Sequence, residues 1–120
     1  MVHKMGLYSK PYNLTSSLDK TIELRLFDDK RRLIEIGDTL QFTDLDNESG
    51  LIVAEVVSIY LADTFKELYE FIPLEKCGYT TEEITNASYE DMYKYYERED
   101  ILKYGVIGIE FKVLQEVRLV

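Results

Sequence analysis

The side chains best suited to chemistry in this sequence lie in one short segment that begins at Lys20. The segment reads Lys-Thr-Ile-Glu-Leu-Arg, so a carboxylate at Glu23 stands between cations at Lys20 and Arg25. A carboxylate beside cations can accept hydrogen bonds from a ligand or, where burial raises its pKa, act as a base. A neighbouring lysine can contact a phosphate or stabilise an oxyanion. The same three side chains could instead form an ion-pair network with a purely structural role.

The pattern of apolar residues predicts that this segment is a β-strand. Apolar residues occupy every second position from Ile22 to Leu26, which is the period of a strand with one face on the core. Because residues two apart on a strand share a face and lie about 6–7 Å apart, Glu23 and Arg25 should be neighbours on the other face. The charged run at 28–32 should then form a turn.

Most of the remaining elements are predicted to be strands, with a helical segment before the last one. Three capping-box patterns, Thr64 with Glu67, Thr80 with Glu83 and Ser88 with Asp91, predict a helical insert from about residue 64 to residue 97. The predicted strands are His3–Tyr8, Thr39–Phe42, Leu51–Leu61 and Val106–Val117, and a short helix is predicted to begin near Ser9.

Length and composition predict one domain, residues 1–120, without a metal or cofactor. The chain has 120 residues with a single cysteine and a single histidine, which excludes an internal disulfide framework and any multi-cysteine metal site. No apolar run is long enough for a membrane span, and the N-terminus has no signal-peptide core. We therefore expect a cytoplasmic protein that does not contact a membrane.

Charge is distributed unevenly along the chain, and this limits the nucleic acids that it could bind. The net charge is −9 overall, but residues 1–35 carry seven Lys/Arg against five Asp/Glu and residues 36–120 carry seven against eighteen. Proteins that bind nucleic acid through phosphate contacts are usually basic. We expect no binding of an extended DNA duplex, and we expect any phosphate contact near Lys20, Arg25, Lys30, Arg31 and Arg32.

Two linked motifs resemble the ASCH domain family, whose members are small β-barrels related to the RNA-binding PUA domains. The motifs are K-T-I-E-x-R-L-x-D-x-K-R and I-x-x-G-D-x-x-x-F, which together span Lys20 to Phe42, and the resemblance returns at Tyr104–Phe111 and His3–Leu7. The resemblance implies a single α+β domain. Its expected fold is a five- to six-stranded, mostly antiparallel PUA-like barrel with flanking helices and the insert at 64–97.

The resemblance also implies one possible enzymatic activity. One branch of the family hydrolyses N4-acetylcytidine with a lysine on this strand, a threonine nucleophile three residues later and a downstream acid. Lys20 matches the lysine, but Glu23 occupies the position of the nucleophile and Thr21 is displaced from it. The downstream acid would fall near Glu75.

Three functions therefore remain open. The first is binding of RNA, a nucleoside or a nucleotide in a cleft between the Lys20 strand and the insert, with a tyrosine as stacking face. The second is hydrolysis, amidohydrolase-like or ribonuclease-like, with Lys20 and Glu23 as catalytic residues. The third is binding of a basic partner protein through the acidic surface of residues 63–103. This segment contains eleven acidic and five basic side chains. The candidate ligand-binding residues are Lys20, Thr21, Glu23, Arg25, Lys30, Arg31, Tyr69 and Tyr104.

Overall fold

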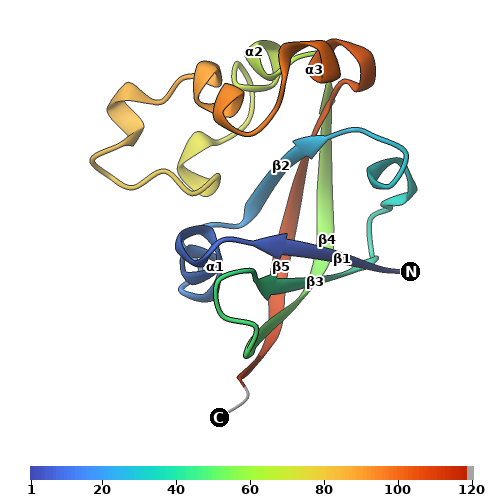
Figure 1. Cartoon of the computed structure of the whole chain (residues 1–120), viewed down its shortest axis with the longest axis vertical. Helices are drawn as coiled ribbons and strands as arrows, with labels where there is room; N and C mark the ends of the chain where they lie inside the picture. Colours follow the sequence, from blue (N-terminus) through green and yellow to red (C-terminus); the bar gives the residue numbers. More distant parts are fainter. Residues whose placement is uncertain (119–120) are drawn as a thin grey trace.

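A five-stranded sheet forms the centre of the computed structural model, which describes residues 1–118 (Figure 1). Its strand order is β1-β3-β4-β5-β2. β1 pairs with β3 in parallel, and the other pairings in this order are antiparallel. The strands are β1 (Val2–Leu7), β2 (Ile22–Leu26), β3 (Thr39–Asp44), β4 (Gly50–Ala62) and β5 (Val106–Arg118).

The sheet is not closed, so the predicted barrel is not confirmed, whereas the predicted α+β class with flanking helices is. β1 and β2 are the two ends of the strand order, and within residues 1–118 no backbone ladder joins them. Side chains connect them instead. Arg25 Nη2 donates to the Gly6 carbonyl oxygen at 2.9 Å, and Lys30 Nζ donates to the Lys4 carbonyl oxygen at 3.0 Å. The direct contact between the two end strands is therefore a side-chain hydrogen bond from Arg25 and not a backbone ladder.

Short helices flank the sheet, and most of them lie in the segment between β4 and β5. The predicted bonds to the capping side chains form at Thr64, Thr80 and Ser88. Only short helices follow these caps. After Thr64 a longer helix is prevented by Pro73, which has no N–H to extend it, and the chain turns at Gly78 with a φ of 99°. No helix in the described part of the chain is long and apolar enough to cross a membrane. The helical elements are α1 (Ser9–Ser16), η1 (Arg31–Leu33), α2 (Phe65–Leu68), η2 (Leu74–Lys76), η3 (Ile84–Asn86), η4 (Tyr89–Lys94) and α3 (Arg98–Tyr104).

β2 is buried on both faces from Ile22 to Leu24, and one of these faces belongs to a hydrophobic cluster. Ile22 and Leu24 pack with Phe65, Leu68 and other residues of the insert. The opposite face carries the charged Glu23, which is also buried, with only 5% of its surface exposed. This differs from the sequence pattern, which predicts that only one face of the strand is buried. Because an unpaired buried charge is strongly destabilising, the charged side chains of β2 must find partners inside the protein.

Candidate functional site

Lys20, Glu23 and Arg25 form a continuous chain of charge-assisted hydrogen bonds. Lys20 Nζ donates to Glu23 Oε1 at 2.6 Å, while Arg25 Nη2 and Nε donate to Glu23 Oε2 at 2.8 and 3.1 Å. The side chains of Lys20 and Glu23 are each 7% exposed. One carboxylate therefore bridges two cations, and the group carries a net charge of +1.

The segment around Cys77 positions Lys20. The backbone of Lys20 forms an isolated antiparallel bridge with Cys77, and the Thr21 N–H donates to the Lys76 carbonyl oxygen at 2.9 Å. Gly78 follows with a φ of 99°, and a Cβ atom there would lie 3.2 Å from Lys20 Cδ. Glycine at this position lets the loop approach the lysine stem, which fixes the direction of the ammonium group.

The two cations keep Glu23 ionised. Burial by itself would raise the pKa of Glu23, but the charges of Lys20 and Arg25 outweigh burial and hold that pKa well below its usual range. At neutral pH Glu23 is therefore a hydrogen-bond acceptor and a very weak base. Lys20 has three N–H donors, and Glu23 accepts one of them. The ammonium group thus keeps donors for a ligand.

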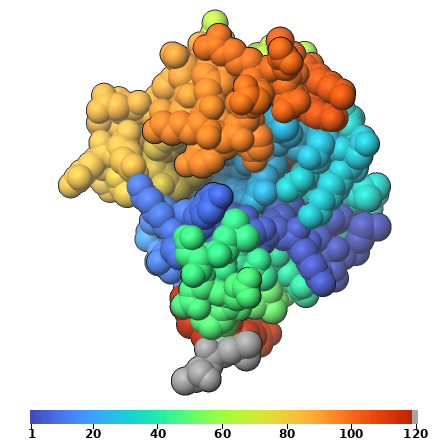
Figure 2. Space-filling model, in the orientation of Figure 1, coloured from blue at the N-terminus to red at the C-terminus, as the bar shows by residue number. Residues whose placement is uncertain are grey.

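This ion-pair chain lines a cleft of about 890 Å³. One side of the cleft comes from β1, α1 and β2, and the other comes from the insert between residues 69 and 96. In Figure 2 the insert, in yellow and orange, lies across from the N-terminal segments, in blue. Ligand sites in proteins commonly enclose about 300–1,000 Å³, so the cleft is large enough for a small molecule.

A second hydrogen-bond chain stiffens the insert side of the cleft. The hydroxyls of Tyr69 and Tyr79 lie 2.8 Å apart, and Tyr79 donates to Asp91 Oδ2 at 2.7 Å. Burial is the main reason that the pKa of Tyr69 rises to about 12 and that of Tyr79 rises further. Both phenols are therefore neutral at physiological pH. They can offer a ring face and a hydroxyl oxygen to a ligand.

An ion pair at the surface connects the two sides of the cleft. Lys10 Nζ of α1 lies 3.1 Å from Glu83 Oε2 of the insert, and both side chains are largely exposed. An exposed pair of this kind contributes about 0–1 kcal/mol. It marks a close approach of the two walls and does not lock them together.

Four of the predicted site residues line the cleft and four do not. The lining residues are Lys20, Glu23, Arg25 and Tyr69, whereas Thr21, Lys30, Arg31 and Tyr104 lie outside it.

The residues outside the cleft have other partners. Lys30 binds the β1 backbone, and Arg31 Nη1 pairs with Asp28 at 3.1 Å. The Tyr104 ring lies 5.0 Å from the Lys103 ammonium. Glu75, the position considered for a downstream acid, is exposed in η2 and does not line the cleft.

Sequence reasoning missed several lining residues that come from distant segments. They come from the start of α1 and the residue before it, the 77–79 loop, the end of η3 and the end of η4, and include Tyr8, Lys10, Gly78, Tyr79, Asn86, Lys94 and Tyr95. Gly78 was the one residue in this set with a local sequence signal, because a glycine favours a turn. The number of tyrosines gave no indication of which ones face the cleft.

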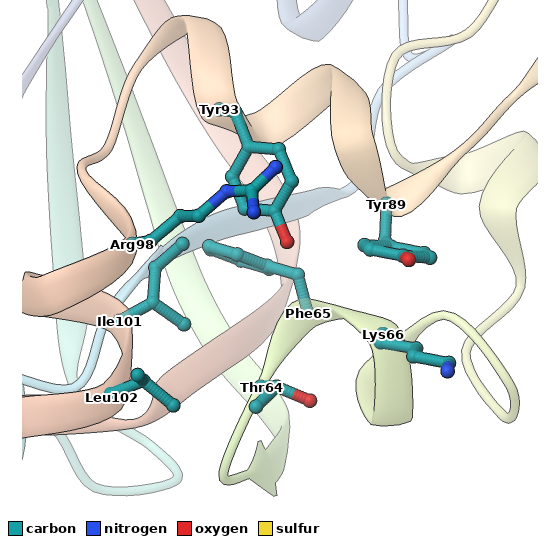
Figure 3. A pocket seen from close by; sticks show the side chains of 8 residues that line it. All are labelled: Thr64, Phe65, Lys66, Tyr89, Tyr93, Arg98, Ile101 and Leu102. Carbon is teal, nitrogen blue, oxygen red and sulfur yellow. The ribbon is translucent and has the colours of Figure 1, made fainter.

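A second, smaller pocket of about 200 Å³ lies between α2, η4 and α3 (Figure 3). The guanidinium of Arg98 lies over the Tyr93 ring at 4.5 Å, and Phe65 forms part of the wall. Its lining is mostly apolar and includes no carboxylate. The larger cleft, with its buried charges and spare donors, is therefore the candidate functional site.

Comparison with known proteins identifies structural relatives. No protein-family model and no curated protein sequence matches the chain. The crystal structure of the hypothetical protein PH0355 is 30% identical over 95% of this chain and all of its own, with a TM-score of 0.76. The solution structure of PF0455 from Pyrococcus furiosus is 31% identical over 96% of this chain and 99% of its own, with a TM-score of 0.68.

More distant structures share the fold alone. The crystal structure of ASCH from Zymomonas mobilis is 13% identical over 98% of this chain and 73% of its own, with a TM-score of 0.63. At this identity the likeness concerns the path of the backbone and carries no information about the residues of a site.

Proposed function

Because the chain belongs to the family of PH0355 and PF0455 and has an ASCH-like fold, we propose that it binds RNA or a nucleotide through its cleft. The cleft takes one unpaired nucleoside unit, either free or within an RNA strand. The observation that carries this proposal is the buried Lys20–Glu23–Arg25 chain at the base of a cleft with tyrosines on its walls.

The chemistry of the lining suits a nucleobase. Spare N–H donors of Lys20 would meet a carbonyl oxygen of the base, and the ionised Glu23 would accept from an exocyclic amine or a ribose hydroxyl. Tyr69 and Tyr79 line the same cleft. Stacking of a base on an aromatic ring stabilises binding and tolerates any base, because every base has a π-face.

The balance of charge in the cleft favours a nucleoside unit over a polyphosphate. The cations of the lining are Lys10, Lys20, Arg25 and Lys94, and its carboxylates are Glu23, Glu82, Glu83 and Asp91. A lining with equal numbers of the two charges cannot neutralise several phosphates. Lys30 and Arg31, expected from the sequence to contact phosphate, lie outside the cleft and could meet only a more distant part of an RNA strand.

The geometry supports binding more than hydrolysis. A carboxylate held between two cations is a poor base, and Thr21 does not line the cleft, so it offers no nucleophile there. Hydrolysis of N4-acetylcytidine can be tested directly, because the acetate that it releases can be measured in the binding samples. Sustained release of acetate would replace the binding proposal with the hydrolase one.

An NMR titration with adenosine, cytidine, guanosine, uridine and N4-acetylcytidine tests the proposal. Shifts should concentrate at the amides of Lys20, Gly78 and Tyr79. Asn86→Trp places a large ring in the cleft and should abolish them, while Thr85→Trp at the adjacent exposed position, outside the lining, should keep them.

The opposite outcomes of this titration are equally clear. Shifts that survive Asn86→Trp would place the site elsewhere. No shift with any probe would remove the nucleoside proposal and turn attention to the acidic surface as a site for a basic partner protein.

A further inference from the structure

Resting on the proposed function, we propose that the rim of the cleft is a second subsite, which stacks the base next to the one held inside. The rim is defined by four exposed residues of the lining, Tyr8, Leu45, Lys94 and Tyr95. The ligand is then an unpaired RNA segment of at least two nucleotides and not a free nucleoside.

The rim exposes apolar surface that the fold does not use. Tyr8 is 60% exposed, Leu45 53% and Tyr95 67%, yet all three line the cleft. No hydrogen bond within residues 1–118 involves the Tyr8 or Tyr95 hydroxyl, in contrast to Tyr69 and Tyr79 inside the cleft. Exposed apolar side chains that line a cleft and that the fold leaves without partners mark a binding surface.

The two exposed tyrosines come from opposite walls. Tyr8 lies between β1 and α1, and Tyr95 follows η4 of the insert. The rim is continuous with the interior, because both sets of residues line one cleft of about 890 Å³. This volume is near the upper end of the range for a whole drug-sized ligand. A single nucleoside would leave part of the cleft unfilled.

Charge at the rim fits the phosphodiester that joins two nucleosides. Lys94 lines the cleft and is exposed, and no ion pair holds it in the part of the chain that the structure describes. Lys10, at the same opening, is already paired with Glu83. One unpaired lysine matches the single negative charge of one phosphodiester. It would not suit the several charges of a triphosphate.

Affinities for ligands of increasing length test the inference. Calorimetry would compare uridine, uridine 3′-monophosphate and UpU, with the other three bases as parallel series. The dinucleoside monophosphate should bind more tightly than its nucleoside by between about fivefold and about 150-fold, the usual gain for one stacked base. Tyr8→Ala and Tyr95→Ala should each reduce this gain and leave nucleoside affinity unchanged.

Conservative and distant variants serve as controls. Tyr95→Phe keeps the ring and should keep the higher affinity for the dinucleoside monophosphate. If the Tyr95 hydroxyl made the contact, this variant would lose the gain in affinity. Phe71→Ala removes an aromatic ring that is 55% exposed but lies outside the cleft, and it should change nothing. All of these positions are exposed, so the variants should fold.

Several results would overturn the inference while leaving the proposed function intact. One is nucleoside binding in the cleft with no gain for the dinucleoside monophosphate. Another is an equal gain for the 3′-monophosphate, which would assign the contact to phosphate alone. A gain that persists in both alanine variants would also overturn it. Absence of nucleoside binding, by contrast, would show that the proposed function itself fails.

Discussion

Arg25 Nη2 donates to the Gly6 carbonyl oxygen across 2.9 Å and so joins β2 to β1, the two strands at the ends of the sheet order. The same guanidinium holds Glu23 through two further hydrogen bonds. One side chain therefore shapes the sheet and the base of the cleft at once. Stability and ligand binding should respond together when it is changed.

Arg25→Lys should destabilise the protein although the charge is kept. A lysine cannot bond Glu23 through two nitrogens and also reach Gly6, so charge-assisted hydrogen bonds are lost, at about 1.5–3 kcal/mol each. Arg118→Lys is the matched control, because the Arg118–Glu116 pair is half exposed and such pairs contribute about 0–1 kcal/mol. Urea unfolding of both variants measures the difference. Equal losses would contradict the bridging role.

Glu23→Gln should be more destabilising than Lys20→Met. Removing the carboxylate charge leaves two buried cations without a counter-charge, whereas removing Lys20 leaves Glu23 paired with Arg25. Breaking a buried ion pair from one side typically costs about 3–5 kcal/mol. Chemical denaturation of both variants and of the double variant gives the coupling energy. A larger loss of unfolding free energy in Lys20→Met than in Glu23→Gln would show that Lys20 stabilises the fold mainly through contacts other than the one with Glu23.

Glu23 should make the protein less stable in acid. The pKa of Glu23 falls from 4.5 to about 2 on folding, since Lys20 and Arg25 outweigh the effect of burial. A lowered folded-state pKa stabilises the native state above the unfolded-state pKa, and this stabilisation is lost as the pH falls from about 4.5 towards 2. Unfolding midpoints at several pH values measure the loss. Glu23→Gln should flatten the dependence in this range, and Glu48→Gln, an exposed carboxylate far along the chain, should not.

Gly78→Ala should affect the site, whereas Gly37→Ala should affect stability alone. Both glycines have positive φ, of 99° and 94°, so alanine is strained at either position, by about 1–3 kcal/mol. A Cβ atom at Gly78 also meets Lys20 Cδ at 3.2 Å, while at Gly37 it meets nothing within 4 Å. The titration with nucleosides should weaken in Gly78→Ala. Equal affinity in the two variants would mean that the loop does not position Lys20.

Tyr79→Phe should loosen the insert. It removes the donor to Asp91 and the partner of the Tyr69 hydroxyl, and both bonds are partly buried. A typical hydrogen bond contributes about 0.5–1.5 kcal/mol. Tyr95→Phe, where the hydroxyl has no partner within residues 1–118, is the matched control and should be neutral. Hydrogen exchange at amides 79–91 should quicken in Tyr79→Phe only. Unchanged exchange would show that packing alone holds this wall.

The features that the sequence determined are local ones. Alternating residues from Ile22 to Leu26 predicted β2 correctly. Both bonds of the capping box form at Thr80 and Ser88, whereas at Thr64 only the bond to the threonine side chain forms. These follow from spacing within one element, where backbone geometry alone decides which residues are neighbours. The proximity of Glu23 and Arg25 on one strand face is of the same kind.

Tertiary structure decided that the sheet stays open and which residues line the cleft. Whether β1 and β2 pair depends on how far the sheet curls, and no local pattern specifies that. Tyr8 and Tyr95 line one cleft although 87 positions separate them in the sequence, whereas Lys30 and Tyr104 point to other partners. Contacts between distant elements arise from the packing of the whole chain, here from the cluster that Ile22 and Leu24 of β2 form with the insert. The sequence therefore identified the charged strand, and the fold determined what faces it.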